Sequence, residues 1–167
     1  MEETLMKRLI ATVAALGAAL VMALPAQASG AGAVSVTQTF HNATQTFVPP
    51  DPNAVQPCTG VPGTLTITYN GVAHSTVLTS GVGAGTGWFT FTATGTFTFI
   101  GSDGVNFTGH FTNWDGQNVN LHNSAGTGIL VVHGTGSDGS SLTFHDVFHM
   151  SVSASGITLF FDKPSCA

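Results

Sequence analysis

The chain has 167 residues, of which 43% are hydrophobic and only 7% charged, and its formal net charge is −5 at pH 7. After residue 28 the only lysine or arginine is Lys163, so no basic cluster is available to neutralise the phosphates of a nucleic acid or the headgroups of an anionic membrane. Nucleic acids and anionic membranes are therefore excluded as expected partners.

The first 28 residues have the three-part layout of a secretory signal peptide. A basic pair precedes an apolar run over residues 9–24, which ends at Pro25 and a small-residue Ala-Gln-Ala site. The alternative, a membrane anchor, needs about 20 apolar residues and usually charged flanks on both sides, whereas the apolar run here is shorter and ends at Pro25. We therefore expect cleavage after Ala28, a secreted, extracellular product, and a single domain over residues 29–167 that is large enough to bury a core.

Cys58 and Cys166 are the only cysteines, and an even count in an exported chain favours a disulfide. A bridge between them would close a loop that runs from residue 58 to residue 166. In the chain-entropy model, a bridge over a loop of that length stabilises the fold by about 4 to 5 kcal/mol. The alternative is a pair of free or metal-binding thiols, but two cysteines without CxxC spacing make a poor metal site. We expect the bridge, and no metal or other cofactor.

From residue 34 onward hydrophobicity alternates with period two, which is typical of strands with distinct faces. The clearest run is residues 88–100, where phenylalanines, an alanine and a glycine share one face and threonines the other. Further strands are predicted at residues 65–69, 107–114, 127–135, 142–152 and 157–161.

Turn residues separate these runs. Asn70-Gly71 predicts a type I′ hairpin turn, Ser155-Gly156 is expected to close the last hairpin, and the Pro-rich residues 49–62 are expected to form a loop.

A Gly-Ser-Asp-Gly repeat at residues 101–104 and 136–139 predicts two hairpins with three-residue loops, each with glycine in the left-handed region. This loop length places the phenylalanines of both strands on one face, whereas two or four residues would set them against the threonines. The predicted opposite pairs are Phe99 with Phe107, Gly95 with Phe111, His133 with Thr143, and Val131 with His145.

Consecutive hairpins with little sign of crossover connections favour an all-β fold, an antiparallel up-and-down barrel of about eight strands. Closure would protect the strand edges. The alternative is a β-sandwich.

The histidines are the first candidates for chemistry, because imidazole can act as a general base, a metal ligand or a pH switch. The alternative is a set of histidines that simply face solvent. His145 and His149 lie four residues apart on a strand, about 13 Å, which is too far to share one ion. His133 and His145 lie diagonally and could share one only with a third ligand such as His110, so we expect no metal site.

Asp146 interrupts the apolar face between Phe144 and Phe148. A carboxyl group buried there would have a raised pKa and could act as an acid or base, whereas a bulge or strand edge would turn it outward. The complete set of candidate ligand-binding residues is His110, His133, His145, His149, Asp146, Trp114 and Thr96.

We do not expect hydrolysis by a familiar catalytic triad, because the chain has no GxSxG motif, no catalytic cysteine and no glycine-rich phosphate loop. The threonines of residues 90–98 resemble the TxT arrays of ice-binding proteins, although threonine is also an ordinary outward-facing strand residue.

Several spaced motifs resemble a family of small exported bacterial proteins that carries no assigned function. They are Pro57-Cys58-Thr59-Gly60, residues 66–71, residues 108–112, and residues 134–149 with the terminal Phe-Asp-Lys-Pro-Ser-Cys. The resemblance implies a secreted domain and the Cys58 to Cys166 pairing, and it implies no catalytic residues. More loosely, the architecture is similar to the barrels of allene oxide cyclase and dirigent proteins, which bind hydrophobic molecules in the lumen.

We therefore expect a secreted, non-enzymatic binding protein for an apolar or aromatic small molecule. One alternative is a cofactor-free isomerase or cyclase with histidines and Asp146 in its lumen. The other is surface or ice binding through the threonine ladder. The sequence predicts no oligomeric state.

Overall fold

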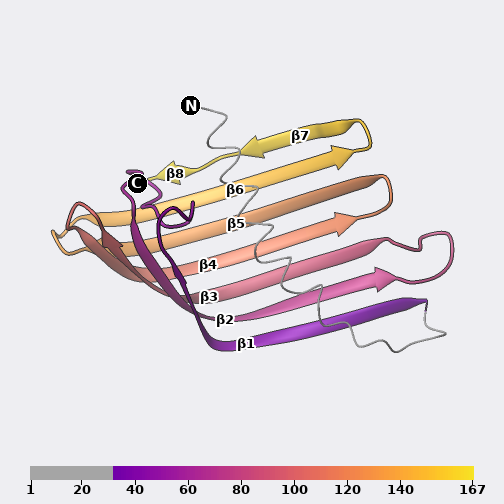
Figure 1. Cartoon of the computed structure of the whole chain (residues 1–167), viewed down its shortest axis with the longest axis horizontal. Helices are drawn as coiled ribbons and strands as arrows, with labels where there is room; N and C mark the ends of the chain where they lie inside the picture. The colour runs from indigo at the N-terminus through magenta and orange to yellow at the C-terminus, as the bar shows by residue number, and fades with distance from the viewer. Residues whose placement is uncertain (1–31) are drawn as a thin grey trace.

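A computed structural model describes residues 32–167, which form one antiparallel sheet whose strands follow chain order (Figure 1). Both β7 and β8 pair with β6, and β8 does so at Phe144 and His145. The strands are β1 (Ala33–Phe47), β2 (Gly63–Leu78), β3 (Gly87–Gly101), β4 (Asn106–Val119), β5 (Asn123–Gly136), β6 (Ser141–Ser153), β7 (Gly156–Asp162) and β8 (Ser165–Cys166).

The all-β, antiparallel, up-and-down arrangement is confirmed. The strand path ends at β1 and β7, so the sheet formed by residues 32–167 is open, and the barrel and the sandwich both remain predictions. The predicted signal peptide, residues 1–28, lies outside the described residues. Within residues 32–167 we find no helix of the length and apolarity that crossing a membrane requires.

The two Ser-Asp-Gly hairpins have the predicted geometry. In the first, the Gly101 N–H donates to the Val105 carbonyl at 3.2 Å, Gly104 has φ 87°, and the Asp103 carboxylate accepts the Val105 N–H at 3.0 Å. The second repeats these features. All four predicted opposite pairs are confirmed, so this loop length does set the register.

The predicted hairpin turn at Asn70-Gly71 is wrong, because β2 runs straight through both residues. Asn70 instead contacts a bulge in the neighbouring strand, β1. Asn42 of β1 has φ 49° there, and its N–H donates to the Asn70 side-chain oxygen at 3.0 Å. The chain turns between β2 and β3 at residues 79–86. The Ser155-Gly156 hairpin is confirmed, with Gly156 at φ 112°.

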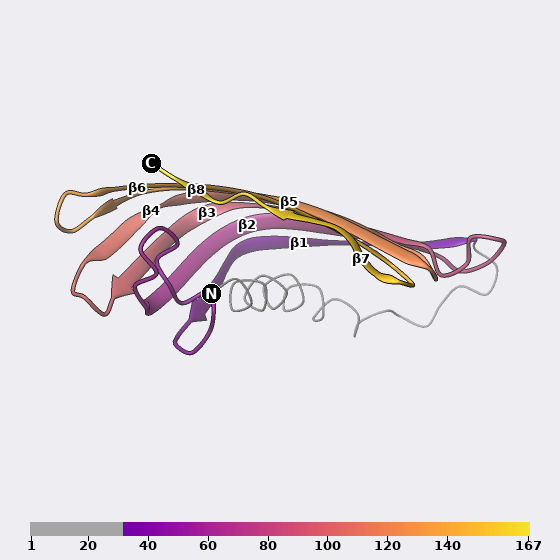
Figure 2. The same cartoon turned by 90° about the horizontal axis from the view of Figure 1, so that it is seen from above.

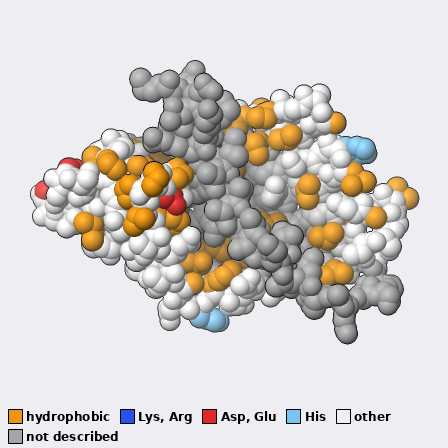
Figure 3. All heavy atoms as spheres, viewed as in Figure 1, with side chains coloured by type: hydrophobic (Ala, Val, Ile, Leu, Met, Phe, Trp, Pro, Cys, Tyr) orange, Lys and Arg blue, Asp and Glu red, His pale blue; other side chains and the backbone are white. Residues whose placement is uncertain are grey.

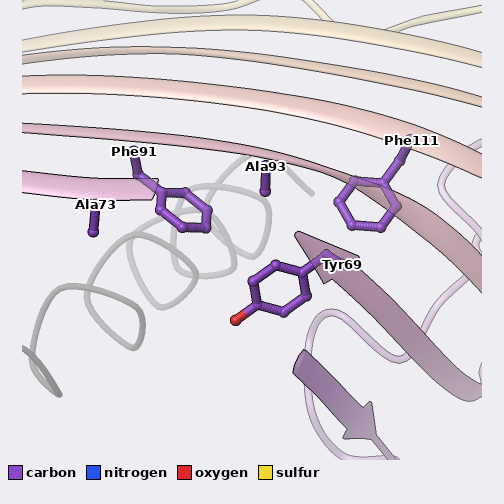
Figure 4. Packing of buried hydrophobic residues seen from close by; sticks show 5 residues of the cluster. All are labelled: Tyr69, Ala73, Phe91, Ala93 and Phe111. Carbon is purple, nitrogen blue, oxygen red and sulfur yellow. The ribbon is translucent and has the colours of Figure 1, made fainter. Parts of the chain in front are cut away.

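The sheet is strongly curved (Figure 2), and buried hydrophobic side chains such as Phe91 and Phe111 lie on its concave side (Figure 4). Four glycines on the concave face of successive strands mark the bend: Gly71, Gly95, Gly109 and Gly134. A Cβ at Gly95 would lie 2.2 Å from the Thr68 carbonyl oxygen, and one at Gly109 would lie 2.0 Å from the His133 carbonyl oxygen. Glycine at these positions lets neighbouring backbones approach on the inner side of the curve.

Two hydrophobic clusters lie on the concave face. The first, shown in Figure 4, is Tyr69, Ala73, Phe91, Ala93 and Phe111. The second, nearer the Ser-Asp-Gly hairpins, is Phe97, Phe99, Phe107, Leu142 and Phe144. Both are made of alternate residues of the strands, as burial of one face requires.

The loop of residues 48–62 lies on the concave side of the sheet (Figure 2). The predicted Cys58–Cys166 disulfide is present, with the two Cα atoms 5.8 Å apart, and it ties this loop to β8. Gln56 is only 5% exposed, and its side-chain oxygen accepts the backbone N–H groups of Cys58 and Thr59, both at 2.6 Å. The buried amide therefore fixes the loop at the point where the disulfide leaves it.

Candidate functional site

The candidate histidines lie on the convex face, opposite the phenylalanines, as predicted. His110 of β4 stands directly opposite His133 of β5, with ring centroids 5.4 Å apart and planes tilted by 38°. Both side chains are exposed. His145 stands opposite Val131, so it is a diagonal neighbour of His133 rather than its direct partner.

His149 is held in place by its neighbours. Its Nδ1 lies 2.7 Å from the Thr127 hydroxyl, its Nε2 lies 2.9 Å from the Ser151 hydroxyl, and its ring stacks on Phe161 at 5.6 Å. The Lys163 ammonium lies 5.3 Å from the centre of the Phe161 ring. Since both ring nitrogens have partners, His149 serves to order the outer strands.

Thr96 and Trp114 also lie on the convex face. Thr96 stands opposite His110, and Trp114 stands between Thr92 and Ile129. The indole of Trp114 is 40% exposed and reaches over Gly116, where a Cβ would lie 2.9 Å from the ring. Gly116 therefore leaves room for the indole to lie along the sheet.

Asp146 faces the concave side, opposite Leu130. The alternative of a bulge that turns it outward is wrong, since the register shift on β6 lies at Ser151 and Val152. Figure 3, viewed as in Figure 1, shows hydrophobic side chains gathered in patches on this side of the molecule. Burial, a hydrogen bond with Asp162 and the charge of Asp162 raise the pKa of Asp146 from its ordinary value of 3.8 to about 7.

Asp115 lies on the same face, separated from Phe148 by Gly128. Burial raises the pKa of Asp115 above its ordinary value, and a hydrogen bond from the Asn113 side-chain amide opposes that rise. The concave face therefore carries carboxyl groups next to its aromatic clusters, where the protonated form is favoured.

The structure thus separates residues that a catalytic lumen would bring together. His110, His133 and His145 lie on the convex face and Asp146 on the concave face, so residues 32–167 form no pocket lined by both. Sequence reasoning missed Asp162 and Asp115. Alternation could have found them, since Asp162 follows Phe160 by two residues on β7 and Asp115 follows Phe111 by four on β4.

A shallow hollow of about 320 Å³ lies beside the disulfide. Its walls include Gln56 and Cys58 from the loop and Phe107 and Leu142 from the second cluster. It contains no side chain that titrates. Within the described part of the chain, no three His, Cys, Asp or Glu residues are grouped closely enough to hold a metal ion.

Comparison with known proteins gives no relative: no family model, no curated protein and no solved structure matches this chain.

Proposed function

We propose that the protein is exported, that residues 1–28 are removed, and that the mature sheet is a non-enzymatic binding module for an apolar or aromatic small molecule. The ligand would lie against the concave face. The observation that carries this proposal is an aromatic concave face in a chain whose described residues form a single sheet, with no second sheet to cover it. A hydrophobic sheet face is stable only when something packs on it.

The ring geometry of the first cluster supports an aromatic ligand. The ring centroid of Phe40 lies 5.9 Å from that of Tyr69 and 6.1 Å from that of Phe91. The Tyr69 and Phe91 rings meet edge to face with their centroids 6.3 Å apart. Tilted and edge-to-face contacts are the arrangements that aromatic rings prefer, and a further ring can join them in the same way. Loop 48–62 lies at one end of the sheet, and the first cluster lies farther along the sheet than that end.

The carboxyl groups of the concave face supply the polar contact that most small-molecule sites contain. With the pKa of Asp146 raised to about 7, the carboxyl pair of Asp146 and Asp162 keeps one proton in mildly acidic solution, and the remaining oxygens can accept a hydrogen bond from a ligand. We therefore favour a ligand with an apolar or aromatic body and one hydroxyl group.

The test uses chain 29–167 secreted without an affinity tag. Titration with the uncharged fluorophore N-phenyl-1-naphthylamine should give saturable binding, and native mass spectrometry should detect small molecules retained from the culture. Phe40→Ala, on the half-buried rim of the cluster, should weaken probe binding by about tenfold, since an aromatic contact and its buried area are lost. Val72→Ala on the convex face, where Val72 is 41% exposed, is the matched control and should bind as wild type does. A mature chain that binds no probe, or equal affinities in all three proteins, would contradict the proposal.

A second candidate function is surface binding through threonine hydroxyls. Five threonines stand directly opposite one another across β1 to β5 on the convex face: Thr46, Thr66, Thr98, Thr108 and Thr135. The row has as many threonines as the ladder of residues 90–98 and shares Thr98 with it, but the sheet is curved and does not offer a flat lattice (Figure 2). Thermal hysteresis that is lost in Thr98→Lys would establish this function, and its absence in wild type would remove it.

A further inference from the structure

We infer that His110 and His133 form a two-imidazole binding site for a divalent transition-metal ion of the zinc and copper class, on the convex face. The site is independent of the proposed concave ligand site. It also departs from the expectation of no metal site, which considered His133 with His145 and not the direct pairing of His110 with His133.

The distance between the rings fits shared coordination. Metal–nitrogen bonds to imidazole are about 2.0 to 2.1 Å, so two imidazoles on one tetrahedral ion have ring centres about 5 Å apart. The ring centroids of His110 and His133 are 5.4 Å apart without any ion between them. In the proposed site the two exposed side chains rotate so that one nitrogen of each ring is directed at a common point.

The backbone holds this pair in place. β4 and β5 are interior strands, paired on their outer sides with β3 and β6, so both histidines sit on a ladder that is fixed on each side. Binding therefore requires little ordering of the chain, which is the main cost at sites assembled from loops.

No other histidine in the described strands stands directly opposite an imidazole, and His41 lies in the bulge of β1. His74 hydrogen-bonds to Thr37 at 2.8 Å and Thr76 at 3.2 Å, and both nitrogens of His149 have hydroxyl partners. His145 faces Val131 and not another imidazole. By contrast, the polar contact that the described residues offer this pair is long, 3.5 Å from the Thr143 hydroxyl to Nδ1 of His133.

The surroundings admit a cation. Both rings are exposed, so water can occupy the remaining coordination positions. The only ammonium or guanidinium group in the described residues, that of Lys163, lies over Phe161 beyond β6. The chain also carries a net negative charge. With two protein ligands the ion exchanges freely, since structural zinc sites have four.

The test is Zn²⁺ titration of untagged chain 29–167 by calorimetry at neutral pH, with ¹H–¹⁵N NMR of the imidazole nitrogens. We expect one ion per chain and perturbed resonances from His110 and His133. His110→Asn and His133→Asn should each lower the affinity by about tenfold or more, since metal affinity depends on the number of imidazole ligands. His145→Asn is the control on the same face and should stay within about twofold of wild type.

All three substitutions are at exposed positions, and thermal unfolding of each variant checks that the sheet is intact. Zn²⁺ affinity that is unchanged in both His110→Asn and His133→Asn would overturn the inference. So would an equal loss in His145→Asn, or the absence of any Zn²⁺ binding by the wild-type chain.

Discussion

Asp146 and Asp162 are diagonal neighbours on the concave face, and each has a buried Oδ1 atom without a hydrogen-bond donor among the described residues. A proton held between the two carboxyl groups satisfies both oxygens, because a protonated carboxyl donates and an ionised one accepts. The rise in the pKa of Asp146 to about 7 has the same origin, since burial and the nearby Asp162 disfavour a second negative charge.

This pair makes stability depend on pH. The pKa of Asp146 is higher in the folded chain than its ordinary value of 3.8, so the folded state binds more protons between those limits. The stabilisation is complete below about pH 4 and is lost as pH rises through about 7. Urea unfolding should therefore show wild type losing free energy of unfolding between about pH 4 and pH 7 relative to Asp146→Asn.

Asp103→Asn, which changes a carboxyl group on an exposed turn, should keep the pH dependence of wild type over the same range. If Asp146→Asn and wild type lose stability in parallel, the carboxyl pair does not share a proton.

The glycine bend predicts a large difference between two similar substitutions. Gly109→Ala places a Cβ 2.0 Å from the His133 carbonyl oxygen, so neighbouring strands must separate. We expect a loss of about 2 kcal/mol or more in the free energy of unfolding, in the range of overpacked cores. Gly126→Ala, on β5, meets nothing closer than 3.8 Å and should change stability by less than about 0.5 kcal/mol. Chemical denaturation measures both, and equal effects would show that the bend does not depend on close backbone approach.

The disulfide should contribute strongly to stability. Cys58 and Cys166 are 108 residues apart, and removing a cross-link over such a loop costs about 4 to 5 kcal/mol in the chain-entropy model. A Cys58→Ser, Cys166→Ser double variant should unfold at lower urea concentration and expose loop 48–62 to proteases. Wild type, unfolded without reductant, should show no free thiol; thiols that titrate there would contradict the bridge.

Export predicts a defined N-terminus. Small residues at positions 26 and 28 are what signal peptidase requires, so the secreted protein should begin at Ser29. N-terminal sequencing of the exported protein tests this. An exported form that begins at Met1 or Met6 would show that no cleavage occurs.

Local signals predicted the fold wherever the turn was self-contained. Each Ser-Asp-Gly loop carries its own glycine and its own aspartate acceptor, so the register of two hairpins followed from the sequence. Asn70-Gly71 misled because the partner that explains it, the Asn42 bulge, lies on another strand. Such a contact is tertiary, and a local pattern does not contain it.

The pairing of His110 with His133 was missed for a related reason. It depends on the β4–β5 connection, which has no glycine. Instead the Asn120 side chain accepts the N–H groups of His122 at 2.9 Å and Asn123 at 2.8 Å. Asparagine can shape a turn by this side-chain bond, but its composition signal is weaker than that of glycine. The residues on each face of β4 and β5 were therefore predicted correctly, but the sequence offered no prediction of the register between these two strands.

The cross-link between Cys58 and Cys166 also determines how the sheet responds to mechanical tension. A force applied to the two ends of the chain passes from residue 58 to residue 166 through the sulfur atoms and bypasses β2 to β7. Only β1 and the residues before Cys58 can then be extended, since β1 is an edge strand that peels from β2. The domain under tension should therefore lengthen only by β1 and the loop residues that precede Cys58, and the histidine face and most of the aromatic face should stay folded.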